Sequence, residues 1–237
     1  MIGVLVNTIT VIVGSCVGLL LKKGIPQRLT AAIMLGIGLC TIYIGIDGMM
    51  AGENTLVLIV SMVLGALVGT LLDLDGKIQA LGDWIEGKFS HKQSLEEGTA
   101  RISLAQGFVT ASLLFCVGSM TIVGSLNAGI SGDNEMLFTK SLLDLISSSM
   151  LAASLGLGVL LSAAFVLVFQ GALVLLASVL APFLTTAAIA ELTCCGSVLI
   201  LALGLNLIGL TKIKVADYLP ALVFVPILSW ALGFLPI

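Results

Sequence analysis

Polar side chains recur at one fixed spacing inside otherwise apolar sequence. The pattern is a small residue, then a hydroxyl residue and then a carboxyl or amide residue. It occurs as Gly38, Thr41 and Asp47, as Gly118, Thr121 and Asn127, and as Ser197, Ile200 and Asn206. In the last copy Ile replaces Thr. A further glycine (Gly45, Gly124 or Gly204) precedes each last residue. Polar groups beside flexible backbone can coordinate a cation or hydrogen-bond a polar solute. The repetition predicts a duplicated membrane unit with breaks in its helices.

Asp47 is the sharpest single candidate, because it lies between Gly45 and Gly48. If the helix opens there, the carboxylate and the freed backbone carbonyls can coordinate a cation, or the acid can bind a proton. The alternative is an acid at the outer end of a helix, near Glu53. A charge at mid-membrane costs ~2.5–3.5 kcal/mol on insertion scales. We expect no Lys or Arg deep inside a span to pair with these acids.

The remaining candidates are one acid, two amides and three hydroxyls: Glu191, Asn127, Asn206, Thr41, Thr121 and Ser119. Glu191 and Asp144 both have an alternative explanation as first-turn acids that the helix dipole favours. A single intramembrane amide more often joins two helices by hydrogen bonds. The equivalent repeat positions of Asp47, Asn127 and Asn206 favour a shared polar site instead.

Enzyme machinery is missing from the sequence. The one histidine, His91, lies in a polar segment, and no zinc-protease, P-loop or nucleophile-elbow motif occurs. The five cysteines form no metal-binding pair and are expected to pack as small apolar residues. The net charge of −3 is uninformative about nucleic acid, but no basic stripe occurs, so we expect no nucleic acid as a partner. We therefore expect no enzyme, no cofactor and no metal.

Composition places the chain in a membrane. It is 59% hydrophobic and 10% charged, against about 25% charged residues in a soluble domain. The longest uncharged run, 145–190, would be ~69 Å as one helix, against a hydrocarbon core of ~30 Å. It must therefore turn, and we expect the turn at 162–164. The prediction is an all-α polytopic fold with eight spans, near 2–21, 29–50, 55–73, 103–127, 140–161, 164–182, 188–210 and 216–235.

The basic residues orient these spans. With eight spans, nine of the ten Lys and Arg residues fall on one side, which the positive-inside rule makes the cytoplasm. Both termini are then outside a bacterial inner membrane. The segment 74–101 is predicted as a cytoplasmic amphipathic linker that lies at the membrane surface, with Trp84 as an anchor.

The whole chain, 1–237, is expected to form one transmembrane domain. On this topology the units 1–73 and 164–237 cross in opposite senses, as in inverted-repeat transporters. GxxxG sequences at Gly14/Gly18 and Gly65/Gly69 favour close helix contacts and allow a homo-oligomer.

Three segments carry a family resemblance: MIGVLVNTITVIVGSCVGLLLKKGIP, LGIGLCTIYIGIDG and VLGALVGTLLDLDGKIQALGDW. They resemble the YqgA/YdfK-like family of uncharacterised bacterial inner-membrane proteins. The resemblance implies a polytopic plasma-membrane protein with suspected transport and no assigned substrate. The residues themselves favour a secondary transporter or permease for a small solute or ion, with cation coupling as an option. A passive channel and a non-transporting scaffold or partner subunit are the alternatives.

Overall fold

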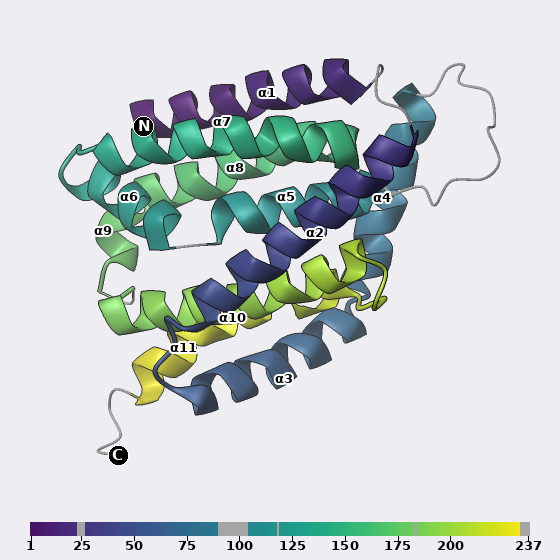
Figure 1. Cartoon of the computed structure of the whole chain (residues 1–237). Coiled ribbons are helices and arrows are strands. Elements are labelled where there is room, and N and C mark those ends of the chain that lie inside the picture. The colour runs from purple at the N-terminus through teal and green to yellow at the C-terminus, as the bar shows by residue number, and fades with distance from the viewer. Residues whose placement is uncertain (23–26, 90–103, 118, 183, 233–237) are drawn as a thin grey trace.

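The computed structural model describes residues 1–22, 27–89, 104–117, 119–182 and 184–232. Within them every secondary-structure element is a helix (Figure 1). The elements are α1 (Ile2–Lys22), α2 (Gln27–Met49), α3 (Thr55–Leu71), α4 (Leu74–Phe89), α5 (Leu104–Cys116), α6 (Ser119–Ile130), α7 (Glu135–Leu155), α8 (Leu157–Leu175), α9 (Ala177–Leu180), α10 (Thr186–Leu207), the short 3-10 helix η1 (Val215–Tyr218) and α11 (Ala221–Leu232).

The helices are long and apolar enough to make a multi-pass membrane protein. Among the described residues, five qualify by length and composition: α1, α2, α7, α8 and α10. The number rises to seven if the bent pairs α3–α4 and α5–α6 are each one span, and α11 belongs to a shorter apolar segment. The all-α membrane class is therefore confirmed, and the count of eight crossings stays a prediction.

The helices pack in two groups that lie side by side (Figure 1). In the first helix group, which includes α1, α7 and α8, α1 runs parallel to α7, since Gly3 lies against Leu137 and Gly18 against Ala153. In the second helix group, which includes α2 and α10, these two helices run antiparallel, since Gly38 lies against Ile208 and Gly48 against Ser197. The apolar core is continuous between the groups, because one cluster of buried residues joins α1, α2, α5, α7 and α8.

The long uncharged run turns at Gly156, between α7 and α8, and not at 162–164 as predicted. Gly156 has φ of 79°, a left-handed conformation that glycine adopts without steric cost. Ser162 and Ala163 are instead fully or nearly buried within α8. The spans predicted at 140–161 and 164–182 therefore each begin several residues earlier than expected.

Helix breaks follow the polar pattern in only one of its copies. The predicted span 103–127 is divided into α5 and α6, which are bent by 59° at the break after Cys116. By contrast, α2 continues through Gly45 and Gly48 and ends at Met49, so the predicted opening beside Asp47 is absent. Gly45 instead lies against Leu201 of α10, which means that this glycine serves close helix packing.

The predicted linker 74–101 begins with α4, which follows α3 at a bend of 52°, and residues 90–101 lie outside the described residues. Trp84 is exposed on α4. Its place at the membrane surface and the repeat units 1–73 and 164–237 stay predictions.

Both GxxxG sequences contact other elements of the same chain, Gly14 and Gly18 at α7 and Gly65 and Gly69 at α11 and η1.

Substitution at these glycines tests the packing. We expect Gly18→Ala to lower the free energy of unfolding by about 1–3 kcal/mol, because the added methyl group would overlap the backbone of Ser149 on α7. Gly36→Ala is the matched control, since nothing lies near that position and alanine has the higher helix propensity. Thermal unfolding in detergent measures both. Equal stability of Gly18→Ala and Gly36→Ala would contradict the α1–α7 contact.

Candidate functional site: a buried polar network beside a broken helix

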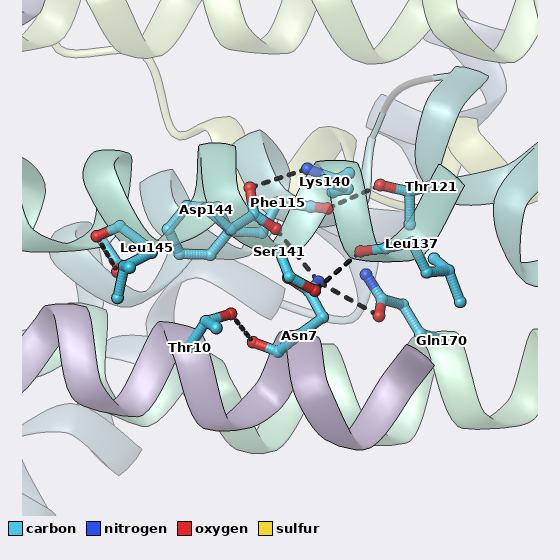
Figure 2. A network of polar contacts seen from close by, with 11 residues as sticks. Asn7, Thr10, Phe115, Thr121, Leu137, Lys140, Ser141, Asp144, Leu145 and Gln170 are labelled. Atoms are coloured by element: carbon cyan, nitrogen blue, oxygen red, sulfur yellow. Dashed lines mark hydrogen bonds and ion pairs between the residues drawn. The ribbon is translucent and has the colours of Figure 1, made fainter. Parts of the chain in front are cut away.

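Four polar side chains from three helices meet inside the first helix group (Figure 2). Lys140 Nζ donates to Asp144 Oδ1 at 2.9 Å, and Asn7 Nδ2 donates to Asp144 Oδ2 at 3.1 Å. Asn7 Nδ2 also lies 3.2 Å from Gln170 Oε1. We call Asn7, Lys140, Asp144 and Gln170 the polar network. Asn7 and Gln170 are 0% exposed, Asp144 3% and Lys140 8%.

Local helix geometry explains how the polar network forms. Lys140 and Asp144 are four residues apart, so they lie on one face of α7. The close approach of Gly3 to Leu137 sets α1 against the first turns of α7, and this brings Asn7 to the same level. Two charges in a low-dielectric interior lose hydration, and good geometry with added hydrogen bonds must offset that cost. Here both carboxylate oxygens of Asp144 accept one.

Two atoms of the polar network have no hydrogen-bond partner within the described part of the chain. They are Asn7 Oδ1, an acceptor, and Gln170 Nε2, a donor. An unsatisfied buried polar group costs about 1–3 kcal/mol, so such atoms usually have a water or a ligand beside them. The polar network therefore offers one free acceptor and one free donor next to an ion pair.

The break between α5 and α6 lies beside this site. Thr121, in the first turn of α6, donates to the backbone carbonyl of Phe115 at 2.9 Å, and both appear next to Lys140 in Figure 2. Cys116, the last residue of α5, is within electrostatic range of Lys140 and Asp144. A helix that ends inside a bundle leaves backbone carbonyls and N–H groups free to bind ions or polar solutes.

Only some of the residues that the sequence predicted for the site lie beside the polar network. Thr121 is fully buried at the edge of the polar network, and Ser119 is the first residue of α6. Asn127 lies two turns further along α6, where its backbone carbonyl accepts from Ser131. Thr41 is buried on α2 and donates to the carbonyl of Ile37 in its own helix.

The other three predicted residues, like Thr41, lie in the second helix group. Glu191 Oε1 accepts from the backbone N–H groups of Glu53 and Asn54 at 2.7 and 2.6 Å, so it anchors the loop between α2 and α3. Asn206 holds the loop after α10. Asp47 is exposed near the end of α2. Since α2 and α10 are antiparallel, Asp47 and Asn206 lie toward opposite ends of the pair, and no common site forms between them.

The expectation that the intramembrane acids lack a cationic partner was wrong for Asp144. The predicted span began at 140, which left Lys140 at the surface, whereas α7 begins at Glu135 and buries it. The signal was present in the sequence, since Lys and Asp four residues apart share a helix face. Asn7 and Gln170 were not among the residues predicted for the site, and nothing in the sequence indicated that they meet.

The fold defines a multi-pass, all-helical membrane protein with a buried polar network. The chain belongs to the family described as "Protein of unknown function (DUF554)", whose model matches residues 2–230. It is 32% identical over 236 residues to the "Uncharacterized membrane protein YdfK" of Bacillus subtilis (strain 168), covering 98% of this chain and 97% of that one. It is also 30% identical over 230 residues to the "Uncharacterized protein YqgA" of Escherichia coli (strain K12), covering 97% of each. No solved structure matches the chain.

Removal of one partner of the ion pair should destabilise the protein strongly. Lys140→Met leaves Asp144 buried without its cation, and Asp144→Leu leaves the buried ammonium, so we expect each to lose about 3–5 kcal/mol. The double variant Lys140→Met/Asp144→Leu should lose less than the sum, because neither charge is left alone. The exposed Lys77→Met is the control. Thermal unfolding measures the series, and additive single losses would contradict a coupled pair.

Proposed function

We propose that the chain is a secondary transporter or permease for a small polar solute or ion, and that the polar network is its transport site. The observation that carries this proposal is the unpartnered pair Asn7 Oδ1 and Gln170 Nε2, buried beside the α5–α6 break. A site that hydrogen-bonds its solute needs such groups, and broken helices supply further backbone ligands. A structural network would be expected to satisfy all its members internally.

The ion pair gives the proposed site a means of cation coupling. Lys140 occupies Oδ1 of Asp144 at 2.9 Å, so a cation or proton that binds this carboxylate competes with the ammonium group. Release of Lys140 would change the charge around Asn7 and Gln170. Occupancy by the coupling ion and by the solute would thereby depend on each other, as binding linkage requires.

A transport role fits the polar network better than an enzymatic role. The hydroxyl nearest to the ion pair in sequence is Ser141, and it donates to the carbonyl of Leu137 at 2.7 Å. Its one proton is therefore engaged with Leu137 and is not donated to Asp144, so this carboxylate does not activate it as a nucleophile. We accordingly place the chain outside the enzymes and assign the polar network to binding.

Transport in proteoliposomes tests the proposed function. The probes are radiolabelled rubidium, sodium, neutral amino acids and small carboxylates, each supplied with and without a proton gradient. We expect the wild type to move at least one probe faster than protein-free liposomes do. Asn7→Leu and Gln170→Leu, which remove the two free atoms, should lower that initial rate at least tenfold.

The control separates transport from folding. Asp47→Asn alters an exposed acid away from the polar network and should transport within twofold of the wild type. Unfolding temperatures of all variants identify any that fail to fold. A wild type that moves no probe, or folded network variants with wild-type rates, would support the scaffold alternative. A rate that rises with concentration without saturation would indicate a passive channel.

Topology is a separate prediction, because the eight crossings place both termini outside. A periplasm-active reporter fused after Ile237 should be active, and the same fusion after Lys77 should be inactive, since Lys77 lies on the Lys-rich side. A cytoplasmic signal from the C-terminal fusion would contradict the eight-crossing arrangement.

A further inference from the structure

A second polar site lies at the opposite end of α5 from the polar network. A pocket of about 360 Å³ opens where α10 ends and where α4 and α5 begin. Its polar lining consists of Asp75, Gln79, Gln106, Asn206, Thr211, Lys212 and Lys214. From Gln106 to Cys116 the distance along the helix is ~15 Å, so this pocket and the polar network are separate places. Ligand pockets range over ~300–1,000 Å³, so its size suits a small molecule.

The wall that carries the two lysines is held in place by Asn206. Its Nδ2 donates to the carbonyl of Ile213 at 2.7 Å, and its Oδ1 accepts from Thr211 Oγ1 at 2.7 Å and from the N–H of Ile213 at 2.9 Å. The partners of Asn206 in these three hydrogen bonds, Thr211 and Ile213, both lie in the short loop that follows α10. Asn206 therefore fixes the loop conformation that puts Lys212 and Lys214 on the wall of the pocket.

Three acids, Asp73, Asp75 and Asp217, lie in or beside the pocket, and Asp75 belongs to its lining. Asp75 Oδ2 accepts from Gln79 Nε2 at 2.6 Å, and Lys214 acts electrostatically on the same carboxylate. Asp217, which is 5% exposed, accepts from the backbone N–H of Asp75 at 2.9 Å. Asp217 and, more weakly, Asp73 are like charges that repel the carboxylate of Asp75. Lys212 has no acid within ion-pair distance among the described residues. The lining thus carries two ammonium groups and one carboxylate, and neither lysine forms an ion pair among the described residues.

We propose that this pocket binds a small molecule through an anionic phosphate or carboxylate group, which Lys212 and Lys214 contact. A lysine ammonium is a compact point charge with three donors and is a common phosphate ligand. The same chemistry could come from the headgroup of an anionic lipid or from a soluble anion, since the pocket lies at the end of the helices. This inference is independent of transport through the polar network.

Thermal unfolding with two probes tests the proposal. In one arm the protein in non-ionic detergent is titrated with inorganic phosphate against potassium chloride of equal ionic strength. In the other it is placed in phosphatidylcholine nanodiscs with and without phosphatidylglycerol. A ligand that binds only the folded state raises the unfolding temperature. We expect a rise in at least one arm, and the arm that responds identifies the source of the anion.

Matched variants assign the effect to the pocket. Lys212→Gln/Lys214→Gln should weaken the apparent affinity at least tenfold, whereas Lys77→Gln, an exposed lysine of α4 outside the pocket lining, should change it less than twofold. Each single variant should lie between the wild type and the double variant. The proposal is overturned if neither probe stabilises the wild type, if the double variant responds as the wild type does, or if Lys77→Gln loses as much as the double variant.

Discussion

The buried ion pair between Lys140 and Asp144 constrains the first helix group more than any apolar contact does. Apolar side chains in a membrane gain little from one another over lipid, whereas an unpaired charge there is costly. Asp144 accepts from Lys140 on its own helix and from Asn7 on α1, and Asn7 also contacts Gln170 on α8. These directional contacts fix the rotation of three helices about their axes.

Close backbone contact makes this arrangement attainable. Glycines on α1 lie against α7, and glycines on α2 lie against α10, so the helices approach within the space that a side chain would need. The same residue type therefore has two roles along the chain. It allows tight packing at Gly18 and Gly45, and it allows the left-handed turn at Gly156 that reverses α7 into α8.

The sequence was sufficient to predict the all-α membrane class, because charge islands and apolar runs reflect the lipid environment directly. The polar pattern predicted breaks in the helices, but 103–127 was predicted as one span, whereas it is divided into α5 and α6, and α2 is unbroken at Asp47. The site could not be predicted, because Asn7, Asp144 and Gln170 lie on three helices whose mutual rotation depends on tertiary packing. The position of Lys140 was predicted wrongly because its helix was predicted to begin at residue 140. Where the helix begins decides whether this lysine lies at the surface or is buried.

The central claim is that Asn7 Oδ1 and Gln170 Nε2 form a binding position and do not merely hold helices together. A high-resolution experimental structure in lipid tests this most directly. We expect an ordered water, ion or solute within hydrogen-bond distance, ~2.7–3.2 Å, of both atoms. A structure in which both atoms bond to other protein groups, with no density between them, would show that the polar network only joins helices.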